Sequence, residues 1–295
     1  MSLPAILPVY RMGSARRAHA RPGRTPPRHL GVPMLPALVL PILVSLGCAP
    51  EGRSAPGPGD AGDTIRVLAY NIHHGEGMDS LLDLERIAAL IRSVDPDLVA
   101  LQEVDSVTTR TGAVDQAAEL ARLTGMDSRF GRFMPYRGGA YGMAILSRWP
   151  VRESTNLRLP EGAEPRSALS VVVQLPGTGR SLRFVGIHLY RSEEERMAQA
   201  VALDSMLAQR DLSTLLAGDF NSTPDSPVLE HLARSWTVVS KGDDRLTYPS
   251  FAPEREIDFV LLRTTDEFEV VRERVLDEPI ASDHRPVLVD LVWNW

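Results

Sequence analysis

The chain has 295 residues, with 32 basic and 38 acidic side chains and a formal net charge of −6 at pH 7. This charge argues against a general binder of nucleic acid or other polyanions. The one cysteine excludes an internal disulfide. Residues 64–295 are more acidic, with 25 basic and 35 acidic side chains and a net charge of −10. Roughly 230 residues without a second linker or an internal repeat predict one domain with a sizeable core.

The first 48 residues differ in kind from the rest. Residues 11–28 carry six arginines and no acidic residue, and residues 30–47 are nearly all apolar. A basic segment followed by an apolar segment and small residues predicts a signal peptide over residues 1–48. Three prolines interrupt the apolar run, and it is shorter than the roughly 20 residues that a membrane-spanning helix needs. We therefore expect export rather than a membrane span.

The only cysteine, Cys48, directly follows Ser45-Leu46-Gly47. This segment resembles the lipobox of bacterial lipoproteins, in which the cysteine is acylated, although Ser45 stands where the lipobox prefers leucine. We therefore expect a membrane-anchored lipoprotein at the cell envelope. Ordinary signal cleavage followed by secretion, or an uncleaved anchor, are the alternatives. Residues 49–63 have the composition of a flexible linker between the anchor and the domain at 64–295.

Eight apolar runs of strand length follow the linker. β-Branched and large apolar residues dominate them, and turn residues separate them. The runs cover residues 65–70, 97–104, 141–147, 167–175, 181–189, 213–221, 256–262 and 286–293.

Apolar residues at helical spacing lie between some of these runs. The spacing predicts a helix over 84–94, which Pro96 ends, and a shorter one around 115–123. A third helix is predicted over 193–210, with these residues on one side: Met197, Ala200, Val201 and Leu207. Helices that alternate with enough strands for two sheets predict an α/β fold, in which helices cover a core of two sheets.

Polar side chains stand within or just after the apolar runs, where an unpaired polar group is costly. They are Asn71, Glu103, His188, Asp219, Asn221, Asp258 and His284. Each alone has a structural explanation, such as an Asx turn at 218–221 or a core polar group that is satisfied by its neighbours. Seven together favour a shared site in which carboxylates bind a divalent metal.

These residues lie in motifs that resemble the ordered motif set of the endonuclease/exonuclease/phosphatase superfamily. The resemblance covers about residues 65–293. The motifs are YNI with Asn71, LQEV with Gln102 and Glu103, GMAILS at 142–147, IHL with His188, GDFN at 218–221, Ile257-Asp258-Phe259 and SDHRP at 282–286. The resemblance implies a four-layer α/β sandwich, with two packed mixed β-sheets flanked by helices. It also implies hydrolysis of phosphoesters with Mg²⁺ or Mn²⁺.

The resemblance also implies roles for individual residues. Glu103 would be the principal metal ligand, supported by Asn71 and Asp283. A protonated His188 and Asn221 would contact the phosphate. Asp219 would position or activate water, and His284, oriented by Asp258, would be the acid/base.

Four further residues are candidates for substrate binding. Arg110 and Arg166 carry guanidinium groups that suit phosphate oxygens, and Tyr141 precedes GMAILS. His73, beside Asn71, stands where some nucleases of the superfamily have an acid, and with His74 it could add a ligand or meet the substrate. Solvated loop arginines and a buried structural tyrosine are the alternatives. Arg285 is expected in a structural ion pair.

The sequence favours a phosphodiesterase that acts on a lipid or glycolipid head group or a small diester. The acidic charge and the lack of a basic, aromatic path argue mildly against long nucleic acid. The segments NIHHGEG and RTGAVDQ resemble a bacterial branch of metal-dependent hydrolases more than DNA-repair nucleases. A secreted or surface-anchored nuclease remains the alternative. A catalytically silent binding protein would lack Glu103, Asp219 or His284, which are all present. We expect a monomer without a protein partner.

Overall fold

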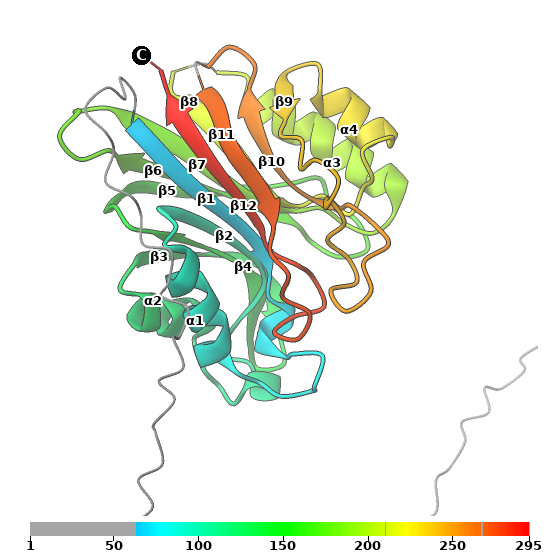
Figure 1. The fold of residues 1–295 in the computed structure, drawn as a ribbon. Helices are drawn as coiled ribbons and strands as arrows, with labels where there is room; N and C mark the ends of the chain where they lie inside the picture. The colour runs from blue at the N-terminus through cyan, green and yellow to red at the C-terminus, as the bar shows by residue number, and fades with distance from the viewer. Residues whose placement is uncertain (1–62, 210, 267, 295) are drawn as a thin grey trace, which may run out of the picture. The chain divides into compact units, whose positions relative to one another are not determined.

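The computed structural model describes residues 63–209, 211–266 and 268–294 (Figure 1). The signal peptide predicted over 1–48, with Cys48, and nearly all of the predicted linker lie outside these residues. Among the helices of the described ranges, none is long and apolar enough to cross a membrane.

Twelve strands form two six-stranded sheets within the described residues. The first sheet has the order β11-β12-β1-β2-β4-β3, and the second has the order β5-β6-β7-β8-β10-β9. Both sheets are mixed, because β1 and β2 are parallel in the first, β7 and β8 are parallel in the second, and the other neighbours are antiparallel. The strands of the first sheet are β1 (Asp63–Asn71), β2 (Leu98–Ser106), β3 (Asp127–Tyr136), β4 (Gly139–Ser147), β11 (Phe268–Val275) and β12 (Val287–Trp293). Those of the second are β5 (Val151–Arg158), β6 (Ser167–Gln174), β7 (Ser181–His188), β8 (Ser213–Asp219), β9 (Trp236–Val238) and β10 (Asp258–Arg263).

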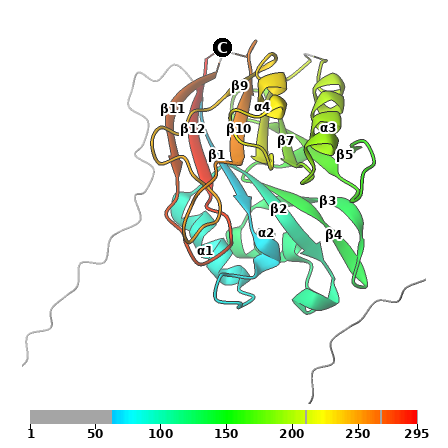
Figure 2. The same cartoon turned by 90° about the vertical axis from the view of Figure 1, so that its right-hand side faces the viewer.

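Helices cover the outer face of each sheet. The first sheet carries α1 (Leu84–Val94) and α2 (Gln116–Thr124), and the second carries α3 (Glu193–Met206) and α4 (Pro227–Leu232). Two short 3₁₀ helices, η1 (His73–Gly75) and η2 (Thr109–Thr111), lie in loops. Figures 1 and 2 show the two helix pairs on opposite sides of the paired sheets.

Three apolar clusters hold these layers together. The cluster between the sheets includes Val67 of β1 and Leu215 of β8, both with no exposed surface. A second cluster buries Ile87 of α1 against the first sheet, and a third buries Leu203 of α3 against the second. Each such fully buried side chain contributes roughly 1.5–3 kcal/mol through the hydrophobic effect. The resulting order of helices, sheet, sheet and helices confirms the four-layer α/β sandwich.

Side-chain caps fix where the longer helices begin. Asp83 accepts the backbone N–H of Arg86 at the start of α1, at 2.9 Å. Asp115 and Ser192 cap α2 and α3 in the same way. An oxygen at this position satisfies one of the free N–H groups of the first turn, which explains why these segments start where they do.

All eight predicted strands are present, and four more occur in the described residues: β3, β5, β9 and β11. Each of the four lies at an edge of its sheet. The prediction for the third helix was wrong in two details. The helix ends at Met206 rather than at residue 210, and Val201 is 45 % exposed, whereas Leu203 is fully buried. At about 100° per residue, Val201 lies on the side of Ala200 that faces away from the other buried residues, Gln199 and Leu203.

Candidate active site

The register of the second sheet places three predicted site residues in one row. His188, at the end of β7, pairs with Asp219, at the end of β8, and Asp219 pairs with Asp258, at the start of β10. All three are at most 3 % exposed. The His188 Nε2 atom lies 3.3 Å from Asp219 Oδ2. Strand pairing alone therefore brings together residues that are up to 70 positions apart in the sequence.

The first sheet contributes Asn71, at the end of β1, and Glu103, in β2. A β-bulge shifts the β2–β4 register between Leu101 and Val104, and Glu103 within it has a left-handed φ of 56°. Bulges redirect side chains near sites, and a non-glycine residue with positive φ carries backbone strain. The bulge directs Glu103 toward Asn71, whose Nδ2 lies 3.4 Å from Glu103 Oε1.

The loop before β12 contributes Ser282 and His284, which contact residues of both sheets. Ser282 donates its hydroxyl to the Asn71 carbonyl at 2.7 Å. His284 Nδ1 lies 2.9 Å from Asp258 Oδ2, and His284 Nε2 lies 3.8 Å from Asp219 Oδ2. The Asn71 amide donates to Asp219 Oδ2 at 3.2 Å. The predicted triplet before the last strand therefore forms one wall of a shared polar site.

Gly218 allows the close approach of β7 and β8 beneath Asp219. Its φ is +146°, and a Cβ atom at this position would lie 2.1 Å from the Ile187 carbonyl oxygen. Only glycine accepts this combination of conformation and crowding. The first residue of the GDFN motif is therefore structural, and it positions the acid that follows.

Burial and the charges of neighbouring groups shift the pKa values of Asp219 and His284. Burial, and then the charge of Asp258, raises the pKa of the Asp219 carboxyl to about 7. Burial alone would lower the pKa of His284, but Asp258, which is hydrogen-bonded to it, and Asp219 raise it to about 10. The pair therefore holds a positive imidazole ring among carboxylates that repel one another.

Burial, followed by the positive charges of Arg166 and His284, lowers the pKa of His188 well below the ordinary value, which disfavours the protonated ring expected from the sequence. Its Nδ1 atom has no hydrogen-bond partner among the described residues. Asn221 keeps one amide N–H for a ligand, because the other donates to the Leu189 carbonyl at 2.9 Å.

The residues around Glu103 suit an oxygen-bound divalent ion. Glu103 and Asp283 line the same part of a groove, and Mg²⁺ needs only one or two protein carboxylates because it keeps several waters. The Asn71 amide presents its nitrogen to Glu103, while its oxygen accepts the His73 backbone N–H at 3.1 Å. A half-turn of the amide is therefore required before Asn71 can bind a metal through oxygen, as predicted.

The groove has two adjoining parts, which share Glu103, His188 and Arg191. One, of about 230 Å³, also contains Asp219, Asn221, Asp283 and His284. The other, of about 290 Å³, extends toward three of the four predicted substrate-binding residues, which are Arg110, Tyr141 and Arg166. His73, the fourth, lies beside Glu103 and outside the set of groove-lining residues.

The two predicted arginines already have protein partners. Arg110 binds the buried carboxylate of Asp105 through Nε and Nη2, at 2.6 and 2.8 Å. Arg166, 4 % exposed, lies 2.7 Å from Glu164, but its Nε and Nη1 atoms have no hydrogen-bond partner among the described residues. Arg166 is therefore better placed to meet a ligand, and substrate binding by either residue stays a prediction. The predicted ion pair of Arg285 is present, with Asp277 at 3.0 Å.

Sequence reasoning missed several residues that line the groove. Arg191, Arg196 and Arg255 line the part of the groove that contains His284, and the ring of Tyr248 lies 4.8 Å from that of His284. With Arg110 and Arg166, five arginines line the two parts of the groove. The missed arginines lie in loops and at the first turns of a helix, outside any motif. Their only sequence signal was proximity to His188 and Asp258.

Comparisons with known proteins agree with this geometry. Residues 68–284 match the Endonuclease/Exonuclease/phosphatase family. The uncharacterized protein YbhP of Escherichia coli is 30 % identical over 169 residues, which cover 54 % of this chain and 67 % of that protein. An endonuclease/exonuclease/phosphatase from Beutenbergia cavernae has a similar crystal structure, with a TM-score of 0.63 and 27 % identity over 78 % of this chain and 72 % of that one. A mannosyl-6-phosphatase of Bacteroides thetaiotaomicron has the same TM-score and 19 % identity, over 78 % of this chain and all of that one.

The fold and the carboxylate-rich site define a phosphoester hydrolase that depends on a divalent metal. Because the family match spans most of the chain, this protein belongs to the Endonuclease/Exonuclease/phosphatase family.

Proposed function

We propose that this chain is an exported phosphodiesterase that uses Mg²⁺ or Mn²⁺ and acts on a small or lipid-linked diester. The observation that supports a diester is the continuation of the groove beyond the catalytic acids. A diester carries a substituent on each side of phosphorus. The two adjoining parts of the groove, of about 230 and 290 Å³, offer room for both.

The positions of the side chains support the following chemistry. Asp219 orients the attacking water and accepts its proton, and the protonated His284, tied to Asp258 through its other ring nitrogen, donates a proton to the leaving oxygen. The water oxygen bonds to phosphorus, and the bond from phosphorus to the leaving oxygen breaks, after which that oxygen takes up a proton. Asn221 and the groove arginines bind the non-bridging oxygens.

Glu103 and Asp283 would hold the metal, with Asn71 as a further oxygen ligand. A bound Mg²⁺ or Mn²⁺ neutralises charge on the phosphoryl group and so favours attack by water. Carboxylate and amide oxygens suit both ions, which supports the proposal that the metal is Mg²⁺ or Mn²⁺.

A nuclease is the second candidate, and the five arginines of the groove favour it. Guanidinium groups bind the phosphates of a nucleic acid as well as those of a lipid head group. The net charge of −10 over residues 64–295 speaks against a long strand, because acidic side chains repel phosphates that lie outside the groove.

The experiment compares four substrates under one set of conditions. The purified full-length chain is assayed with Mn²⁺ or EDTA against bis-p-nitrophenyl phosphate, p-nitrophenyl phosphate, plasmid DNA and a phospholipid. Metal-dependent cleavage of the diester or the lipid, with intact plasmid, is expected. Nicked plasmid at the same enzyme concentration would instead establish a nuclease, and preference for the monoester would establish a phosphatase.

Two variants assign the activity to the site. His284→Ala is expected to abolish hydrolysis. His231→Ala, which changes a histidine of α4 outside the groove, is expected to retain it. Equal activity in both variants would show that His284 is not part of the reaction.

The proposal includes export and anchoring of a monomer at the cell envelope through an acylated Cys48. It rests on the basic and apolar segments of residues 1–48 and on the small residues before the cysteine. Cell fractionation tests it, because Cys48→Ser is expected to move the protein from the membrane to the soluble fraction. Retention of the variant in the membrane would rule out a lipid anchor at this residue.

A further inference from the structure

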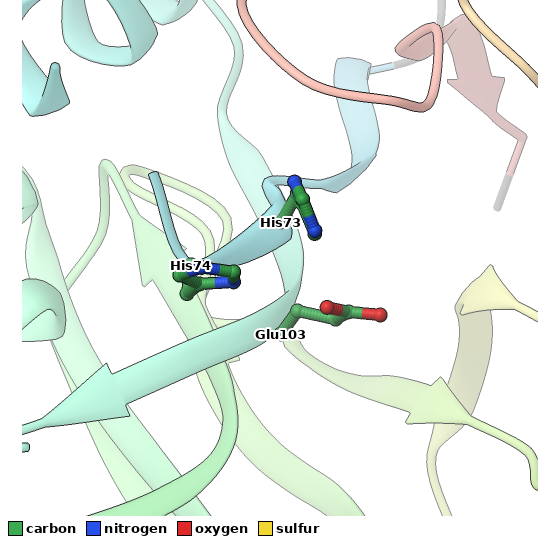
Figure 3. A group of neighbouring side chains, drawn as sticks. All are labelled: His73, His74 and Glu103. Carbon is green, nitrogen blue, oxygen red and sulfur yellow. The ribbon is translucent and has the colours of Figure 1, made fainter. Parts of the chain in front are cut away.

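Two consecutive histidines lie beside Glu103, away from the row of catalytic residues. His73 and His74 form the short helix η1 directly after β1. One ring nitrogen of each and a carboxylate oxygen of Glu103 lie within 4.8 Å of one another. Figure 3 shows the His73 ring extending toward Glu103, with His74 on the neighbouring part of the same loop.

Glu76 binds one nitrogen of each ring and leaves the other one available. Its backbone carbonyl lies 3.1 Å from His73 Nδ1, and its carboxylate Oε2 lies 3.5 Å from His74 Nε2. A carbonyl or carboxylate that accepts from one imidazole nitrogen leaves the lone pair on the other, and this is the usual arrangement around metal-binding histidines. His74 is 8 % exposed, and its Nδ1 is buried without a hydrogen-bond partner in the described part of the chain.

The loop that carries the two rings is held in place by its backbone. His73 and His74 both have left-handed φ angles, 44° and 46°. Gln116 of α2 donates to the His74 carbonyl at 2.7 Å, and the Glu76 backbone N–H donates to the His73 carbonyl at 2.9 Å. These contacts maintain an otherwise unfavourable conformation, so both rings stay on the side of Glu103.

We propose that His73, His74 and Glu103 form a second metal site, which takes a divalent first-row transition ion. Two imidazole nitrogens and one carboxylate suit such an ion, whereas Mg²⁺ and Ca²⁺ prefer oxygen ligands only. Bonds of about 2.1 Å bring donor atoms to within roughly 3–3.5 Å of each other, so the three side chains need to move only a little to bind one ion. Glu103 links this site to the oxygen-lined metal site of the proposed reaction.

The surrounding charges favour a cation. The carboxylates of Glu76 and Asp105 act on His74, and Glu103 adds a third negative charge to the site. Arg110 is the opposing positive group near His74, but its guanidinium is bound by both oxygens of Asp105. The remaining negative charge comes from Glu76 and Glu103, and it is compensated when a divalent ion binds.

Metal binding in excess Mg²⁺ tests the proposal. The full-length chain is dialysed against Co²⁺ in the presence of excess Mg²⁺, which fills the oxygen-lined site. Bound Co²⁺ is measured by atomic emission and by its visible absorption spectrum. One Co²⁺ per chain, with an absorption band typical of nitrogen ligands, is expected. Complete displacement of Co²⁺ by Mg²⁺ would overturn the proposal.

Variants identify the ligands. His73→Gln and His74→Gln are each expected to weaken Co²⁺ binding at least about tenfold. Glu76→Gln is expected to cost less, because it changes only the carboxylate beside His74 and keeps the backbone carbonyl beside His73. His231→Gln, outside the groove, is the matched control and is expected to bind as the wild type. Unchanged Co²⁺ affinity in the His73 and His74 variants would refute the site. If the buried His74 variant does not fold, the more exposed His73 variant decides.

The measurement is independent of hydrolysis. A histidine-dependent Co²⁺ site in a chain that cleaves no tested phosphoester would refute the proposed function and support the metal site. Hydrolysis without histidine-dependent Co²⁺ binding would do the opposite.

Discussion

The buried ion pair of Arg110 and Asp105 gives the sharpest stability prediction. Asp105 has no exposed surface, and Arg110 binds both its oxygens, at 2.6 and 2.8 Å, while the Thr108 hydroxyl donates to it at 2.6 Å. Arg110→Ala leaves a buried carboxylate without its counter-charge. Removing one partner of a buried pair costs about 3–5 kcal/mol, so we expect a loss of that size in the free energy of unfolding.

A surface pair of the same chemistry serves as the matched control. Arg122 lies 2.6 Å from Glu119 on α2, but the Arg122 side chain is 67 % exposed. Arg122→Ala is expected to cost less than about 1 kcal/mol. Arg110→Lys keeps the charge but loses the two-pronged geometry, so its cost should fall between those of the two alanine variants.

Urea unfolding of the full-length chain at one pH measures all three variants. The midpoint of Arg110→Ala should fall while the slope of the free energy with urea stays unchanged. Equal midpoints for Arg110→Ala and Arg122→Ala would refute the argument that burial sets the cost. A fully stable Arg110→Ala with a raised KM would show instead that Arg110 serves the substrate.

Three further changes test other parts of the site. Asp258→Asn keeps the size of the side chain but removes the charge that orients the catalytic imidazole, so kcat should fall roughly 10²–10⁴-fold with an unchanged near-ultraviolet circular dichroism spectrum. Lys241 is the only lysine, is 5 % exposed and lies 2.6 Å from Glu256. Lys241→Met should therefore lower the unfolding free energy, measured with urea, by about 3–5 kcal/mol. In the wild type an amine-reactive dye should label this residue only after unfolding. Gly218→Ala should lower both Tm and activity, because its Cβ would lie 2.1 Å from the Ile187 carbonyl oxygen.

Burial explains which strands could be predicted from the sequence. The predicted runs became central strands such as β6, in which seven of eight residues are buried and five are apolar. The missed strands are all at sheet edges, and β5 has four consecutive exposed residues. An edge strand exposes polar side chains and pairs on one side only, so neither an apolar run nor a regular alternation marks it in the sequence.

Position in a strand or in a loop also explains which site residues could be predicted from the sequence and which groove arginines could not. His188, Asp219 and Asp258 could be found because each is a polar residue at the end of a buried strand, where sheet register brings them into one row. Arg191 and Arg255 flank these strands in loops, where an arginine is ordinary, so only the folded chain shows that they face the groove. The lowered pKa of His188 also depends on the fold, because burial and the charge of Arg166 cause it.

The acidic domain and the arginine-lined groove together support the proposed preference for a small or lipid-linked diester. At physiological ionic strength charges are screened over about 8 Å. Acidic side chains elsewhere on the surface therefore hardly weaken the electrostatic attraction between the groove arginines and a bound phosphate. The acidic side chains do repel the phosphates of any ligand that extends beyond the groove across the surface. A long polyanion would therefore be attracted at one point and repelled along the rest, whereas a diester with neutral or lipid substituents would gain the attraction alone. This contrast, rather than the net charge of −10 by itself, is the physical reason to prefer a diester that carries its charge at the scissile phosphate.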